Sequence, residues 1–373
     1  MQADFHYYAT YCAAYLAGYS HEECMDICYS AQLVDLCSRS FLSGIKADEK
    51  AATTMLSLEM MDARTDPVGL QDITRIWSSF HFLPRDLYAS KKKRTRLYMN
   101  KYRLICGPNG DLAKKTVMLA KDRPLQWAGI AMHVIADTWA HAYFAGTPSL
   151  VINNTNDDFF EVREGEEGLT RHKIRFRHSP SAADDTEKGL YTNSMYQGHE
   201  NSVMNLGHGR AGHLPDYSFI RYGYLPAWNE YRTIIKDNPA EYRNAFIQMI
   251  TALRYLRGVT GSFETEKYDT QVIADHEDRI MQILTKRQLI ASDDWKAFGE
   301  ELSGKTIDDF DVSKYQEEYT GAAGDAKDET FLGKFIKGAL AQKGMVSDEI
   351  YRSGNLLAGF VVKDLIDDTI SKI

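Results

Sequence analysis

The sequence predicts an all-α protein, a multi-helix bundle with a long irregular insertion and a helical C-terminal appendage. Three observations support this fold class. Helix-starting signals precede apolar segments of helical period, strand-like alternation is weak along the whole chain, and the stretch from 147 to 226 has no sustained period. We expect residues 1–260 to form a metal-binding helical domain that contains this insertion at 147–226, and residues 261–373 to form the appendage.

Several helices have recognisable ends. Ser20-His-Glu-Glu23 is a capping box, so a helix is expected to begin there and to continue to about residue 38. A proline precedes the segment 125–145, and Gly-Thr-Pro follows it, which predicts one helix between them. Asn238-Pro239 combines a capping residue with a first-turn proline before the segment 240–257. Helical spacing returns in the appendage near 268–287, 293–302 and 327–342.

Composition excludes several classes of protein. Hydrophobic residues make up 44% and charged residues 26% of the 373 positions, which is the balance of a folded globular chain. No window holds the roughly 20 apolar residues of a membrane span, and the first residues do not resemble a secretory signal. Five cysteines, an odd number, fit reduced thiols, so we expect a cytoplasmic protein. The net charge of −8 gives no strong nucleic-acid signal, and the oligomeric state stays open.

The insertion is rich in histidine. A loop of this length inside a compact domain is usually functional or disordered. We favour a functional role because the insertion holds five of the eleven histidines, at positions His172, His178, His199, His208 and His213.

The strongest chemical signal lies in the segment 125–145. His133, Asp137 and His141 recur every four residues, which places them on one stripe of a helix. His133 and His141 then stand about 12 Å apart, too far to share one ion easily. A carboxylate between two imidazoles suits a bridging ligand that holds two ions about 3.5 to 4 Å apart. The spacing therefore predicts two or more divalent ions around Asp137.

Other segments must complete the coordination. The candidates are flanked by apolar or glycine residues, and they are His6, Asp35, His81 and His208. Imidazole and carboxylate together favour zinc, with iron or manganese as alternatives, over calcium. Each of these side chains taken alone fits equally well a core residue that is satisfied by hydrogen bonds.

Four motifs carry a resemblance. Asp4-Phe-His6, Phe80-His-Phe-Leu-Pro84, His133-Val-Ile-Ala-Asp137-Thr-Trp-Ala-His141 with the following Ala-Tyr-Phe-Ala-Gly146, and Gly207-His208 resemble those of an uncharacterised bacterial family. More distantly, His-x-x-x-Asp resembles the central motif of the zinc-dependent phospholipase C and single-strand nuclease superfamily. That second resemblance implies a paired metal site and a further ion. Its paired site would take His6, Asp35, His81, His133 and Asp137, and its further ion would take His141 and His208.

The chain departs from the phospholipase pattern in two places. It starts with Met where that superfamily has a Trp ligand, and it lacks the later His-x-x-x-Glu helix, because Val203, Gly212 and Tyr217 follow its candidate histidines by four residues.

The leading functional hypothesis is metal-dependent hydrolysis of a small phosphorylated substrate. Asp137 would bridge the ions, and Asp216 would act as a general base or, more in keeping with known sites, orient a ligand histidine. Further cations would neutralise substrate phosphate, namely Arg210 and the group Arg85, Lys91, Lys92, Lys93 and Arg94. Two rival hypotheses use the same ligands: an iron-dependent oxygenase, and a non-catalytic helical binding protein with a structural metal.

Overall fold

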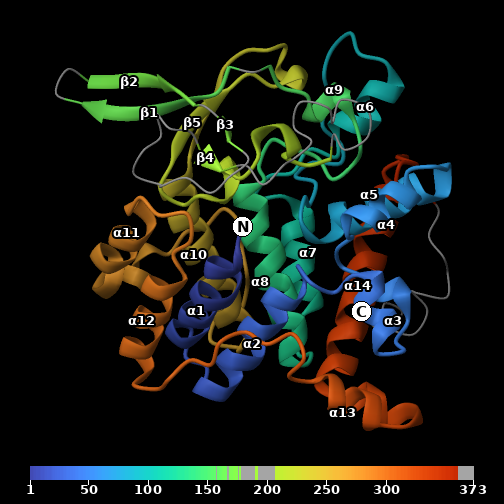
Figure 1. Ribbon diagram of the computed structural model, residues 1–373, viewed down its shortest axis with the longest axis vertical. Coiled ribbons are helices and arrows are strands. Elements are labelled where there is room, and N and C mark those ends of the chain that lie inside the picture. The colour runs from blue at the N-terminus through green and yellow to red at the C-terminus, as the bar shows by residue number, and fades with distance from the viewer. Residues whose placement is uncertain (157, 166–167, 175, 178–189, 192–205, 360–373) are drawn as a thin grey trace.

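The computed structural model describes residues 1–156, 158–165, 168–174, 176–177, 190–191 and 206–359. Its fold corrects the all-α prediction, because an antiparallel sheet packs at one end of a predominantly helical body (Figure 1). The sheet is built largely from the segment 147–226, which was expected to be irregular. None of the helices among these residues is long and apolar enough to span a bilayer.

The helices follow one another along most of the chain. A π-helical turn, η1 (Asp4–Ala9), precedes the first of them. The α-helices of the described residues are α1 (Thr10–Leu16), α2 (His21–Leu33), α3 (Arg39–Gly44), α4 (Ser57–Ala63), α5 (Pro67–Phe80), α6 (Arg96–Tyr102), α7 (Asp111–Leu119), α8 (Leu125–Ala140), α9 (Leu150–Asn153), α10 (Asn238–Leu256), α11 (Glu277–Thr285), α12 (Ser292–Ser303), α13 (Gln316–Gly321) and α14 (Phe331–Arg352).

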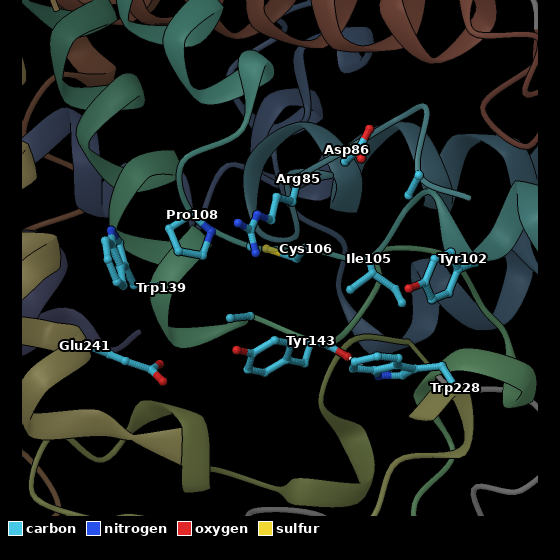
Figure 2. A pocket seen from close by; sticks show the side chains of 13 residues that line it. Arg85, Asp86, Tyr102, Ile105, Cys106, Pro108, Trp139, Tyr143, Trp228 and Glu241 are labelled. Carbon is cyan, nitrogen blue, oxygen red and sulfur yellow. The ribbon is translucent and has the colours of Figure 1, made fainter. Parts of the chain in front are cut away.

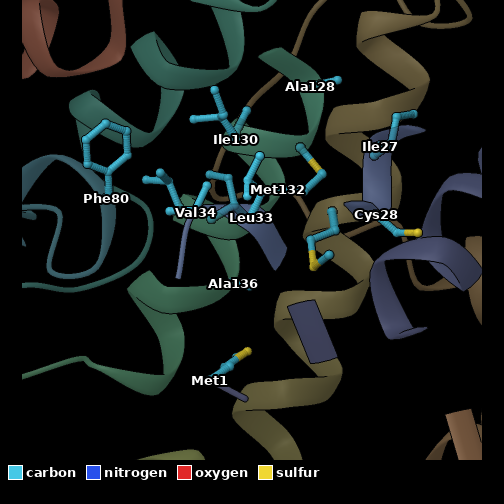
Figure 3. Close-up of a cluster of buried hydrophobic side chains, with 14 of the residues drawn as sticks. Met1, Ile27, Cys28, Leu33, Val34, Phe80, Ala128, Ile130, Met132 and Ala136 are labelled. Carbon is cyan, nitrogen blue, oxygen red and sulfur yellow. The ribbon is translucent and has the colours of Figure 1, made fainter. Parts of the chain in front are cut away.

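Helix α8 is the centre of the molecule. Every residue from Gln126 to Ala140 is buried, because apolar side chains surround this helix on all sides. Helices α2, α5, α7, α10 and α14 and the turn η1 pack around it (Figure 1). Apolar side chains of α8 such as Ile130 and Met132 meet those of α2, as Figure 3 shows. The polar residues of α8 are therefore held inside the core.

The helix ends follow local chemistry. The predicted capping box is confirmed, since the Glu23 N–H donates to Ser20 Oγ and the Ser20 N–H donates to the Glu23 carboxylate. Helix α8 begins after Pro124 as expected but ends at Ala140, five residues early. It ends there because the next residues pair with another segment: the Tyr143 N–H donates to Cys106 O, and the Cys106 N–H donates to Phe144 O.

The main sheet has the strand order β2-β1-β5-β6 and is antiparallel throughout. The strands are β1 (Phe160–Gly165), β2 (Gly168–Lys173), β5 (Arg221–Tyr224) and β6 (Ile234–Asp237), and a separate parallel pair is β3 (Phe176–Arg177) with β4 (Leu190–Tyr191). A second apolar cluster, which includes Phe144, Tyr222 and Tyr224, joins the sheet to the end of α8. This cluster fixes the turn 206–220 over the C-terminal end of α8.

The C-terminal helices share the main core. Helix α14 packs on α5 and α8, and α12 packs on α1 and η1. A buried carboxylate ties this region to the sheet, because Glu161 of β1 receives Arg287 Nη1 at 2.6 Å and Arg163 Nη2 at 2.8 Å. The apolar core therefore runs from the first residues to Ile350 and beyond.

Candidate metal centre

The structure brings together all seven ligands that the sequence predicts. They lie at the C-terminal end of α8, and they come from separate elements. Helix α8 supplies His133 and Asp137, and its C-cap is His141. The others are His6 on η1, Asp35 just after α2, His81 at the C-cap of α5, and His208 in the turn that leads into the 3₁₀ segment Gly209–Ala211.

These side chains form three overlapping groups. In each group the nearest side-chain atoms lie within 4.8 Å of one another, which is close enough to hold an ion. The first two groups share His133, and the third is connected to them through Asp137, whose carboxylate also faces His141. The groups are His6 with His133 and Asp137, Asp35 with His81 and His133, and His141 with His208 and Asp216.

Asp137 faces all of these neighbours. Its Oδ1 lies 3.2 Å from His6 Nε2, and its Oδ2 lies 3.2 Å from His133 Nε2 and 3.3 Å from His81 Nδ1. His141 Nδ1 is 3.5 Å from the same Oδ2. The two carboxylate oxygens thus point at different imidazoles, as a bridging ligand requires.

The close approach of α2 to α8 orients His133. A Cβ on Gly129 would stand 2.4 Å from the carbonyl oxygen of Ile27, so only glycine allows this contact. Because the two helices touch here, His133 Nδ1 donates to the carbonyl of Ala31 at 2.9 Å. Gly129 precedes His133 by one helical turn, so the stripe that holds the ligands also makes the helix contact.

Backbone carbonyls fix the tautomers of three histidines. A carbonyl only accepts, so the ring nitrogen that faces it carries the proton. Besides the bond from His133, His81 Nε2 donates to Thr53 O at 3.0 Å, and His141 Nδ1 donates to His81 O at 2.7 Å. The other nitrogen of each ring faces the cluster. Ligating histidines are oriented in this way in metal sites.

Two of the ring nitrogens that face the cluster lie next to other acceptors. His133 Nε2 lies 3.2 Å from His81 Nδ1, and both lie close to Asp137 Oδ2. Such a contact repels unless a proton or a cation lies between the lone pairs. Burial lowers the pKa of His81, which disfavours the proton. A metal ion placed between these atoms would balance these contacts.

His6 gives the same indication independently. Its side chain is fully buried and stacks on the His133 ring, with centroids 3.8 Å apart. Within the described part of the chain, neither of its ring nitrogens makes a hydrogen bond. Burial and the neighbouring His133 lower the pKa of His6 to about 4, so the ring is neutral. A buried imidazole whose ring nitrogens make no hydrogen bond costs free energy that coordination would recover.

The third group is held by the turn 207–216. Gly207 has φ +54, and a Cβ there would stand 2.0 Å from the Phe82 ring, so glycine alone can place the next residue, His208. Asp216 Oδ1 lies 3.4 Å from His141 Nε2, and its Oδ2 lies 3.7 Å from His208 Nε2. His213 Nδ1 lies 3.0 Å from Asp216 Oδ2, at hydrogen-bond distance. Asp216 is therefore placed to bind an ion as well as to orient a histidine.

The amino group of Met1 lies inside the cluster, which the sequence did not indicate. It is buried 2.6 Å from Asp137 Oδ1 and 3.3 Å from Asp216 Oδ1. Burial alone would lower its pKa, but Asp137, Asp216 and Asp35 raise the pKa of this amine to about 11. The site therefore stabilises a positive charge at its centre.

The carboxylates keep their negative charge. Burial alone would raise the pKa of Asp137, but His141, the Met1 amine and His6 hold it well below its usual range. Burial alone would also raise the pKa of Asp216, but the Met1 amine and His208 hold it well below its usual range. Burial also lowers the pKa of His208 to about 4. The two anionic carboxylates make this site attractive to cations.

The predicted phosphate-binding cations lie elsewhere. Lys91 Nζ and Arg94 Nη2 pair with Glu230, at 3.7 and 2.6 Å, while Lys92 and Lys93 are exposed. Arg85 lines a separate cavity, and no hydrogen bond or ion pair within the described residues joins these five side chains to the metal-ligand cluster. Arg210 lies in the turn beside His208. Of the insertion's histidines, His172 lies on β2, and His178 and His199 fall outside the described residues.

The fold and the site define a helix-rich protein with a buried cluster of histidine and aspartate that could hold metal ions. The chain belongs to a family of unknown function, DUF6765, whose model matches residues 1–350. This agrees with the predicted membership of an uncharacterised family. It does not support the resemblance to the phospholipase C superfamily, and no characterised protein and no solved structure matches the chain.

Proposed function

We propose that the chain is a metal-dependent hydrolase of phosphoesters that uses two or more divalent ions around a bridging Asp137. The observation that carries the proposal is the set of carbonyl-anchored histidines, in which His81 Nδ1 and His133 Nε2 face Asp137 and His141 Nε2 faces Asp216. A cluster of this kind would repel itself in the core without cations. Three overlapping ligand groups favour more than one ion.

The donor set favours zinc, with iron or manganese as alternatives. Bound divalent ions would lower the pKa of water and neutralise phosphoryl oxygens, which is the chemistry that phosphoester hydrolysis needs. Within the chain, Asp216 accepts from His213 and lies close to His141, so it can orient the imidazoles. Arg210, in the same turn, is the cation that we assign to the substrate's phosphate.

Elemental analysis together with a hydrolysis assay tests this proposal. The full chain would be purified without added metal, and its metal content would be measured by mass spectrometry. Activity would be measured on para-nitrophenyl phosphate and bis(para-nitrophenyl) phosphate. We expect zinc, manganese or iron in the protein, hydrolysis of at least one ester, and loss of both in Asp137→Asn.

The matched control is Asp122→Asn. Asp122 is 85% exposed, and asparagine tolerates its positive φ, so this variant should keep both metal and activity. Metal in the purified chain with no ester hydrolysis would contradict the hydrolase and leave a structural metal site. A chain that neither contains nor takes up metal would contradict the whole proposal.

A further inference from the structure

A second cavity lies apart from the metal-ligand cluster. Its volume is about 390 Å³, which is within the range of small-molecule sites. Figure 2 shows Arg85 and Tyr143 on facing sides, Trp139 and Glu241 toward one end, and Tyr102 and Trp228 toward the other. The cavity is therefore walled by aromatic rings, with a guanidinium among them.

The aromatic wall is built rigidly. The Tyr143 and Trp228 rings stack at an interplanar angle of 27° with centroids 6.0 Å apart. The centroid of the Tyr102 ring lies 6.2 Å from that of the Trp228 ring. Lys91 Nζ and the Tyr98 hydroxyl both donate to the carbonyl of Trp228. The basic segment after Arg85 thus holds one wall of the cavity in place. Flat faces presented in this way favour a planar ring as ligand.

Tyr143 adopts a backbone conformation that is rare for a side-chain-bearing residue. Its φ is +79, in the left-handed region. Two hydrogen bonds hold it there, because its N–H donates to Cys106 O and its carbonyl accepts from Trp228 Nε1 at 2.9 Å. Strain that is held by its surroundings in this way gathers at ligand sites. The ring of this strained residue, Tyr143, faces into the cavity.

Of the three charged side chains that line the cavity, Glu241 is the one that forms an ion pair within the described residues. Glu241 pairs with the buried Lys236 at 2.5 Å, and Asp86 accepts the N–H of Tyr88. Arg85 is exposed, and within the described residues its guanidinium makes no ion pair. A guanidinium next to aromatic faces is suited to bind a carboxylate in a bidentate manner.

We propose that this cavity binds a small planar aromatic carboxylate, with its ring against Tyr143 and Trp228 and its carboxylate on Arg85. The proposal is independent of the metal-ligand cluster and of the hydrolase activity. Burial and Glu241 raise the pKa of Tyr143 while Arg85 opposes them, so the phenol keeps its proton and can donate to the ligand.

The probe for this site is naphthoate, with the neutral amide of the same ring, naphthamide, as its comparison. Binding to the full chain would be measured by calorimetry and by quenching of tryptophan fluorescence. We expect naphthoate to bind about tenfold more tightly than naphthamide, because an ionic hydrogen-bonded contact contributes about this factor. Arg85→Gln should remove the preference, and Trp228→Leu should weaken both probes.

The matched control is Arg352→Gln. Arg352 is 68% exposed at the end of α14, so its loss should leave the affinity for naphthoate unchanged. Arg85 is itself exposed, so its variant should fold as the parent does, which thermal unfolding would check. Equal affinity for naphthoate in Arg85→Gln and the parent chain, or no binding of naphthoate at millimolar concentration, would overturn the proposal.

Discussion

Asp137 is the residue on which the metal-ligand cluster depends most. Its two oxygens face His6, His81, His133 and His141, whereas each histidine faces only part of the cluster. We therefore predict that Asp137→Ala loses more metal than either His133→Ala or His141→Ala. The metal content of the three variants would be compared by mass spectrometry. Equal losses would mean that Asp137 serves one ion only.

His6 makes the metal-free protein sensitive to acid. Its pKa is about 4 in the folded chain, against an ordinary value of 6.5. The unfolded chain therefore takes up a proton as the pH falls below 6.5, while the folded chain does so only near 4. The free energy of unfolding should decrease across this interval by about 3 kcal/mol from His6 alone, and it should not change above it.

Urea unfolding of the chelator-treated protein at about pH 7.5 and about pH 4 measures this decrease. His6→Asn is the control, because it removes the titrating ring and should show a smaller decrease. A decrease of the same size in both proteins would assign the acid sensitivity to other groups.

Among the elements, α2 and α8 approach each other closely at Gly129. An added Cβ at Gly129 meets the backbone of Ile27, which cannot move as a side-chain end could. We predict that Gly129→Ala destabilises the fold by about 3 kcal/mol and lowers metal content, since it displaces the carbonyl that orients His133. Gly44 has open space around the position of a Cβ, so Gly44→Ala should change the stability little. Full metal content in Gly129→Ala would show that this carbonyl is dispensable.

The helices were predictable because their signals are local. The Ser20 cap and the apolar periods of α8 and α10 lie within the helices themselves. The sheet was not predictable, because its strands are only four to six residues long and β2 is exposed over most of its length. Such strands carry no alternation of buried and exposed residues, so their pairing depends on distant partners.

The candidate site was also predictable only in part. His133, Asp137 and His141 were recognisable because one helix places them on one stripe. His6, Asp35, His81 and His208 were recognisable as residue types, but their convergence depends on tertiary packing. The carbonyls of Ala31, Thr53 and His81 have no sequence signal, because any residue supplies a carbonyl. The buried amine of Met1 was missed because a main-chain amine likewise has no sequence signal.

At the scale of the whole molecule, the ligands join segments that are far apart in the chain. An ion that binds only the folded state stabilises it by mass action, by about 4 kcal/mol at a thousandfold excess over its dissociation constant. We predict that chelation lowers the melting temperature by several degrees. Calorimetry with and without chelator measures this, and zinc added back should restore the original value. An unchanged melting temperature in protein that is shown to lose its metal would contradict it.

The order of the ligands along the chain has a consequence for synthesis. His6 leaves the ribosome about 200 residues before Asp216 and the turn that precedes it. Until then the nascent chain presents an incomplete set of imidazoles and carboxylates, which binds metal less tightly and less selectively than the finished cluster. An ion that fills the proposed centre would therefore be acquired late, after the sheet has brought the turn over α8, and metal supply at that moment would determine which ion is bound.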